Sequence, residues 1–137
     1  MSAFHILLVE DNEADILLTT ELLVQIGMNH SLSVARDGVE AIDYVLKRGK
    51  YSEAVTPNLI LLDINLPKAS GTEVLSNIKK DDKYKKIPVI IYTSSFLEAD
   101  RIFCESLGAN LYLTKANTMA EFSKRIEDFK NFLSMIL

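Results

Sequence analysis

The chain has 137 residues, 48% of them hydrophobic, and a formal net charge of −4 at pH 7, which together predict one globular domain with enough apolar material for a core. The negative charge argues against a nucleic-acid partner, and no apolar run approaches the roughly 18 residues that a membrane span requires. A single cysteine, Cys104, excludes an internal disulfide, and the N-terminus has no signal-peptide pattern, so we expect a cytoplasmic protein.

Five short apolar segments predict β-strands: Phe4–Val9, Ser31–Ala35, Leu59–Leu62, Val89–Tyr92 and Leu111–Leu113. Four of them are nearly continuous apolar runs, which is typical of parallel strands covered on both faces. Ser31–Ala35 instead alternates polar and apolar residues, which indicates an edge strand with one face partly exposed to water.

Helical patterns fill the intervals between the strands. We expect helices over about residues 12–26, 37–49, 72–80 and 95–108, and from residue 118 onward. Asp37, Ser95 and Thr118 each precede a glutamate by three residues, which is the spacing of a capping box. Gly27, Gly49 and Gly108 follow helical patterns, as expected of residues that end helices.

The apolar spacing also predicts which side of the last two helices is buried. The fourth helix is expected to bury Ile102, Phe103 and Leu107, and the fifth to bury Met119, Phe122, Ile126, Phe129 and Leu133. Phe132 and Met135 fall outside that stripe, and exposed apolar groups of this kind can mark a contact face.

Five alternations of strand and helix predict an α/β fold, a doubly wound parallel sheet with helices on both faces. The polar strand belongs at an edge, and the strands that end before Glu10 and Asp63 belong side by side where the winding direction reverses. The flavodoxin-like strand order 2-1-3-4-5 meets both conditions. We expect residues 1–137 to form this single domain, with residues 48–58 as an internal loop and no output domain.

Polar side chains follow four of the predicted strands, namely Glu10 and Asp11, Asp63 and Asn65, Thr93 and Ser94, and Lys115. The carboxyl ends of parallel strands open onto one rim, so these groups are expected to converge. Carboxylates and a loop carbonyl suit Mg²⁺, while an ammonium and a hydroxyl suit phosphoryl oxygens. In such a site Asp63 can be the nucleophile that forms an acyl phosphate.

Four motifs occur in order at these strand ends: Val9-Glu10-Asp11-Asn12, Leu62-Asp63-Ile64-Asn65-Leu66-Pro67 with Gly71, Pro88 through Ser94, and Gly108 through Lys115. Over essentially the whole chain they resemble the receiver domains of two-component response regulators, which have a CheY-like fold. The resemblance implies a signalling protein rather than an enzyme. It implies that Asp63 accepts phosphate from a phosphohistidine on a sensor histidine kinase or a phosphotransfer protein.

The same resemblance implies a metal site. Asp11, Asp63 and the backbone carbonyl of Asn65 would bind Mg²⁺, with Glu10 acting nearby through water.

It also implies a switch. Thr93 and Lys115 would sense the phosphoryl group, and Tyr112 would be the aromatic residue whose rotamer follows. The face built from the fourth helix, fifth strand and fifth helix would then be remodelled to bind a downstream protein or a second copy in a homodimer.

Three positions depart from the family pattern. Ala116 stands where a proline usually follows the lysine, Glu10 stands where aspartate is common, and Ser94 stands where alanine is common. The long segment before Leu59 and the Lys115-Ala-Asn-Thr118 ending resemble stand-alone receivers paired with phytochrome-type histidine kinases.

Three other functions could use a fold of this class. A Mg²⁺-dependent phosphatase usually needs a second acid two residues after its nucleophile, where this chain has Asn65. A phosphorylation-independent binding module would keep the fold without the switch, and the missing proline is the only feature in its favour. A flavin-phosphate binder would need glycine and hydroxyl donors where Glu10 through Glu13 are mainly acidic.

Overall fold

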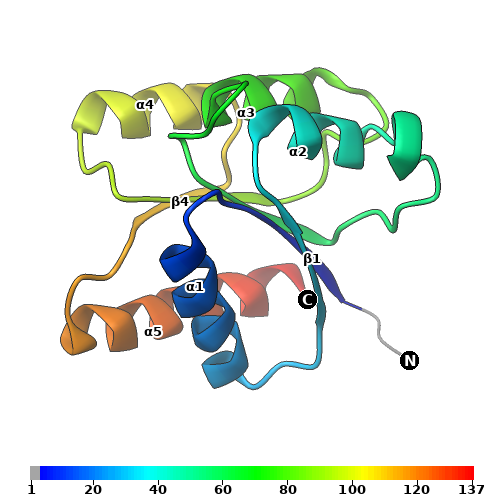
Figure 1. The fold of residues 1–137 in the computed structure, drawn as a ribbon. Helices are drawn as coiled ribbons and strands as arrows, with labels where there is room; N and C mark the ends of the chain where they lie inside the picture. The colour runs from blue at the N-terminus through cyan, green and yellow to red at the C-terminus, as the bar shows by residue number, and fades with distance from the viewer. Residues whose placement is uncertain (1–3) are drawn as a thin grey trace.

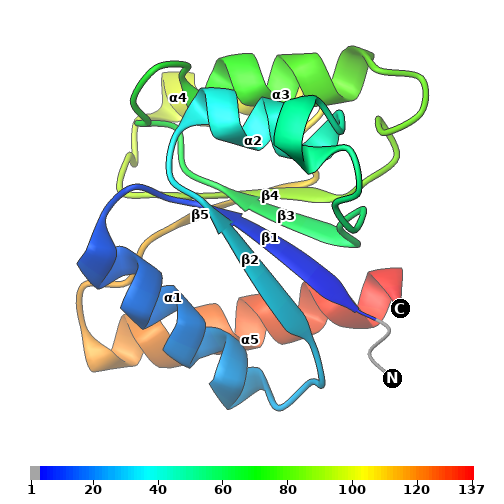
Figure 2. The ribbon, with the colours of Figure 1, turned by 45° about the vertical axis from the view of Figure 1, so that its right-hand side comes forward.

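The computed structural model describes residues 4–137. Its sheet has five parallel strands in the order β2-β1-β3-β4-β5 (Figure 2). The strands are β1 His5–Val9, β2 Ser31–Ala35, β3 Leu59–Leu62, β4 Val89–Thr93 and β5 Leu111–Thr114. The predicted order and the edge position of β2 are confirmed. β1 and β3 are neighbours, with Val9 beside Leu62, so the residues that follow them meet at one edge of the sheet.

Helices cover both faces of this sheet (Figure 1). One layer holds α1 Glu13–Ile26 and α5 Met119–Ile136, and the other holds α2 Gly38–Val45, α3 Gly71–Lys80 and α4 Glu98–Ser106. Successive side chains of a strand point to opposite faces, so Leu7 and Val9 pack with the α2–α4 layer and Ile6 and Leu8 with the α1–α5 layer. No helix within residues 4–137 is both long enough and apolar enough to span a bilayer.

Side-chain caps fix where the helices begin. The Asp37 carboxylate accepts from the Glu40 amide at 2.7 Å, and the Thr118 hydroxyl accepts from the Glu121 amide at 3.1 Å, as predicted. Such caps satisfy amides that have no partner within the helix. Gly27 ends α1 in the left-handed conformation with φ of 83°.

The prediction that the second helix extends to Gly49 is wrong. α2 ends at Val45, and Lys47 has a φ of 59°, which lies outside helical geometry. A short 3₁₀ turn, Gly49–Tyr51, follows within the predicted internal loop. Gly49 therefore begins this turn and does not end the helix.

The predicted cap of the fourth helix is also wrong, and so is its predicted buried face except for Leu107, which is partly buried against the core. Leu97, not Ser95, is the N-cap of α4, and Ile102 and Phe103 are 55% and 52% exposed. The fully buried side chain of α4 is Cys104, which is 0% exposed. The sequence pattern favoured the largest apolar groups, but α4 packs on the sheet through its smaller residue.

In α5 the predicted stripe is confirmed for Phe129 and Leu133, which are buried. The expectation that Phe132 lies outside the core is wrong, because it is 8% exposed and packs in the α1–α5 cluster. Met119, predicted inside, is 79% exposed at the first position of the helix. Met135 is exposed as predicted.

Candidate functional site

Two buried carboxylates lie at the carboxyl edge of the central strands. Glu10 follows β1 and Asp63 follows β3, and their side chains are 3% and 8% exposed. The Asp63 amide donates to the Val9 carbonyl at 3.2 Å, which continues the strand pairing to this point. The sheet therefore fixes the backbone positions from which both acids reach the rim.

The Lys115 ammonium lies between these acids. Its Nζ donates to Glu10 Oε1 at 2.6 Å, to Asp63 Oδ2 at 2.8 Å and to Asp15 Oδ2 at 2.9 Å. An ammonium has three N–H donors, so these carboxylates use all of them. The Lys115 amide also donates to the Thr93 carbonyl at 2.8 Å, which anchors the loop after β5 to the end of β4.

The second oxygen of Asp63 has its own donors. The Thr93 hydroxyl donates to Asp63 Oδ1 at 2.7 Å, and the Asn65 amide donates to the same atom at 3.2 Å. Thr93 is fully buried. The structure thus brings the predicted phosphoacceptor, hydroxyl and lysine into direct contact, with an ammonium on one carboxylate oxygen and a hydroxyl on the other.

Burial and ion pairing shift two pKa values at the site. Burial raises the pKa of Glu10, although hydrogen bonds from Lys115 and the Asn12 amide oppose the shift. Burial alone would lower the pKa of Lys115, but its hydrogen bonds to Asp63, Glu10 and Asp15 raise it above its ordinary value. Lys115 therefore stays charged, as a group that neutralises anions must.

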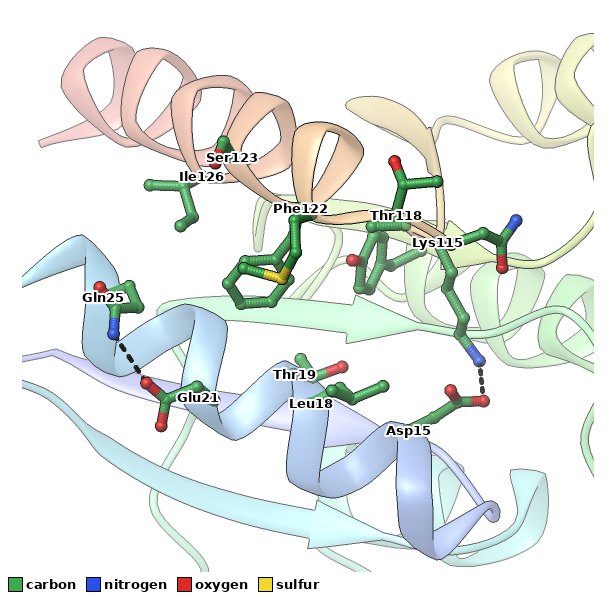
Figure 3. A pocket seen from close by; sticks show the side chains of 14 residues that line it. Asp15, Leu18, Thr19, Glu21, Gln25, Lys115, Thr118, Phe122, Ser123 and Ile126 are labelled. Carbon is green, nitrogen blue, oxygen red and sulfur yellow. Dashed lines mark hydrogen bonds and ion pairs between the residues drawn. The ribbon is translucent and has the colours of Figure 1, made fainter.

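Asp15 is a site residue that the sequence analysis missed. It lies in the first turn of α1, where Asn12 caps the helix by accepting from the Asp15 amide at 2.9 Å. Figure 3 shows its carboxylate paired with Lys115 across the space between α1 and the loop that leads into α5. No feature of the sequence singled it out, because an acid in the first turn of a helix is also expected from the helix dipole.

The predicted magnesium ligands differ in exposure. Glu10 and Asp63 are buried, whereas Asp11 and Asn65 are exposed at the mouth of the site. Among residues 4–137 no three acidic, histidine or cysteine side chains are already arranged around a common metal position. The donor set is nevertheless all oxygen and carries excess negative charge, which fits a hard divalent cation. The ligand set stays a prediction.

Tyr112 is connected to the site through the loop after β4. Its hydroxyl donates to the Ser95 carbonyl at 2.9 Å, and the Ser95 amide donates to the Thr93 hydroxyl oxygen at 3.4 Å. Hydrogen bonds therefore lead from Asp63 through Thr93 to Tyr112. Ser94, one of the departures from the family pattern, is exposed.

The lysine loop forms without the usual proline. No cis peptide bond occurs within residues 4–137, so the bond from Lys115 to Ala116 is trans. Lys115 Nζ nevertheless donates to Asp63 Oδ2 at 2.8 Å, which is a normal hydrogen-bond length. The proline is therefore not required to place the ammonium.

Gly71 lets α3 begin directly against the phosphoacceptor loop. A Cβ at this position would lie 2.1 Å from the Asp63 carbonyl oxygen and 2.7 Å from the Ile64 Cα. Both atoms belong to the backbone, so Gly71→Ala is expected to displace the loop and lower the free energy of unfolding by about 2 kcal/mol. Urea unfolding would measure the loss, with Ser76→Ala in the same helix as the control. An unchanged unfolding midpoint in Gly71→Ala would contradict the close approach.

The fold and this site define the class of protein. A family model described as response regulator receiver domain matches residues 6–127, and the chain belongs to that family. Receiver-domain response regulators are mostly signalling proteins without enzymatic output.

Several relatives resemble this chain over most of its length. The response regulator Rcp1 of Synechocystis is 42% identical over 93% of this chain and 86% of its own length. The crystal structure of its Mn²⁺-bound form matches with a TM-score of 0.88 and 40% identity, over 96% of this chain and 94% of that one. The phosphorylated cyanobacterial phytochrome response regulator RcpA matches with a TM-score of 0.87, 40% identity and the same coverage. The predicted likeness to phytochrome-linked receivers is confirmed.

Proposed function

We propose that this chain is a single-domain response regulator that accepts a phosphoryl group on Asp63 in a Mg²⁺-dependent reaction. The donor would be a phosphohistidine on a sensor histidine kinase of the phytochrome type, or on a phosphotransfer protein. One observation carries the proposal: Lys115 and Thr93 contact opposite oxygens of the Asp63 carboxylate in a buried site. This arrangement provides positioning and charge neutralisation, which supply most of the catalysis in phosphoryl transfer.

In the proposed reaction an Asp63 oxygen attacks phosphorus and the bond from phosphorus to the histidine nitrogen breaks. The released imidazole takes a proton from solvent, and Asp63 becomes an acyl phosphate. Mg²⁺ would be held by Asp11, Asp63 and the Asn65 carbonyl, with Glu10 acting through water, and would neutralise phosphoryl oxygens. Lys115 and Thr93 then donate to the new phosphoryl oxygens, which offer more acceptors than the carboxylate.

The signal would leave through α4, β5 and α5. Movement of Thr93 toward the phosphoryl group would change the conformation of the loop after β4, in which Ser95 accepts a hydrogen bond from Tyr112 of β5. The population would then shift between two packings of this face. The segment before α4 exposes Phe96 and Leu97, which are 84% and 62% exposed, and α4 exposes Ile102 and Phe103. We propose that this apolar surface binds a downstream protein or a second copy of the chain, in the cytoplasm and without enzymatic turnover.

The experiment is labelling by a small phosphodonor. Incubation with radiolabelled acetyl phosphate and millimolar Mg²⁺ is expected to give a protein-bound phosphoryl group that is labile to hydroxylamine. Chelation of the metal by EDTA should abolish labelling, because phosphoryl oxygens and acidic side chains then repel one another without neutralisation. Hydroxylamine-stable label, or label unaffected by EDTA, would contradict the proposal.

Magnesium titration distinguishes the phosphorylation-independent binding module. A working site should show a saturable change in the amide NMR signals of Asp11 and Asn65, whereas a module without the switch should show none. Steady turnover of a phosphate ester would instead support the phosphatase. The structure offers that reaction only Asn65 at the position where an acid is needed, and an amide cannot protonate a leaving group.

A further inference from the structure

The three acceptors of the Lys115 ammonium differ in how deeply they are buried. The side chains of Glu10 and Asp63 are 3% and 8% exposed, whereas that of Asp15 is 31% exposed. Asp15 lines a groove of about 630 Å³ between α1 and α5, and Lys115 lies at the same end of it (Figure 3). Water therefore reaches one of the three ion pairs far more easily than the other two.

We propose that Asp15 is a positioning residue that holds the Lys115 ammonium in the unphosphorylated protein and releases it when Asp63 is phosphorylated. This inference rests on the proposed function and adds a regulatory contact to it. Asp15 has no part in the chemistry of the phosphoryl group. It acts through Lys115 alone.

Phosphorylation converts the Asp63 carboxylate into an acyl phosphate whose carboxyl group carries no charge, so one phosphoryl oxygen can replace Asp63 Oδ2 as an acceptor of the Lys115 ammonium. A second phosphoryl oxygen gains a hydrogen bond from Lys115 only if Glu10 or Asp15 is given up. Leaving Glu10 without its partner would strand a buried charge, which is costly. Asp15 can be hydrated from the groove when it loses the ammonium, so of these two bonds the one to Asp15 is the less costly to break.

The backbone of α1 keeps Asp15 in place while Lys115 moves. The Asn12 side chain accepts from the Asp15 amide at 2.9 Å, and the Asn12 carbonyl accepts from the Ile16 amide at 2.9 Å. The adjacent Ile16 side chain is buried in the α1–α5 cluster. Asp15 is thus a fixed acceptor that competes with the phosphoryl oxygens for the Lys115 ammonium.

Removal of this competition should favour the phosphorylated conformation. In Asp15→Asn, the affinity for beryllofluoride, a phosphoryl mimic, is expected to rise about threefold at fixed Mg²⁺, since a partly exposed ion pair no longer has to break. Asp15→Glu should restore the wild-type affinity because it keeps the charge. Glu13→Gln is the matched control: it removes a carboxylate from the same turn of α1, but Glu13 pairs with Arg36 and not with Lys115.

A second readout needs neither metal nor phosphoryl group. In the free protein, exchange of the Lys115 ammonium protons with solvent, followed by NMR, should be faster in Asp15→Asn than in the wild type and unchanged in Glu13→Gln. Equal beryllofluoride affinity or equal exchange in Asp15→Asn and the wild type would overturn the assignment of Asp15. If the wild type itself binds no beryllofluoride, the proposed function fails instead, so the two failures are distinguishable.

Discussion

Asp63→Asn is expected to lose essentially all phosphoryl incorporation from acetyl phosphate while remaining folded. The amide keeps the shape of the side chain and can still accept a hydrogen bond from Thr93, but its oxygen is a far weaker nucleophile than a carboxylate. Lys115 would retain Glu10 and Asp15 as partners, so the ammonium is not left without an acceptor. Radiolabel counts and intact-protein mass spectrometry would measure the loss.

The control for this substitution is Asp82→Asn. The Asp82 side chain is 97% exposed and pairs with Lys85 on the surface, so this variant should be labelled like the wild type. Circular dichroism should show both variants folded. Undiminished labelling of Asp63→Asn would mean that another carboxylate accepts the phosphoryl group, and the assigned roles of Thr93 and Lys115 would fail with it.

The fold was predictable because several independent signals agreed. Apolar runs marked the five strands, and caps such as Asp37 and Thr118 marked helix starts, with side-chain hydrogen bonds that the structure confirms. The strand order was predicted from the polar pattern of Ser31–Ala35 and from the two strands that are followed by Glu10 and Asp63. Convergence of Asp63, Thr93 and Lys115 followed in turn, because parallel strands present their carboxyl ends on one rim.

Features that depend on how a helix rotates on the sheet were not predictable. Cys104 rather than Ile102 faces the core from α4, and Phe132 joins the core of α5, because packing depends on the shape of neighbours and not on hydrophobicity alone. Asp15 was missed for a related reason. An acid in the first turn of a helix is also expected from the helix dipole, so its sequence position carried no signal of a tertiary contact with Lys115.

Lys115→Met is expected to lower the free energy of unfolding at pH 7 by about 3 kcal/mol, because breaking a buried ion pair leaves uncompensated charge. Methionine preserves the aliphatic length but leaves Glu10 and Asp63 without their cation. Urea unfolding followed by circular dichroism would measure the change. The control is Lys124→Met, whose side chain is 66% exposed and pairs with Asp128 on the surface, and it should change stability little.

The pH dependence of Lys115→Met provides a sharper test than the loss itself. Burial raises the pKa of Glu10, and without Lys115 nothing in its immediate contacts replaces the ammonium. The folded variant therefore binds a proton more tightly than the unfolded chain does, so its stability rises as pH falls from 7 toward the ordinary glutamate pKa. In the wild type the pKa of Glu10 is raised less, because the hydrogen bond from Lys115 opposes the effect of burial, so acidification stabilises the wild type less than the variant. The Lys115 charge itself stabilises the wild type throughout this range, since that contribution is lost only as pH rises through the raised lysine pKa. The difference in the free energy of unfolding between the wild type and Lys115→Met should therefore become smaller on acidification. Addition of Mg²⁺ at pH 7 should also make this difference smaller, because it supplies a cation. A difference that stays constant from pH 7 to pH 5 would show that Lys115 stabilises the fold by packing and not by neutralising the acids.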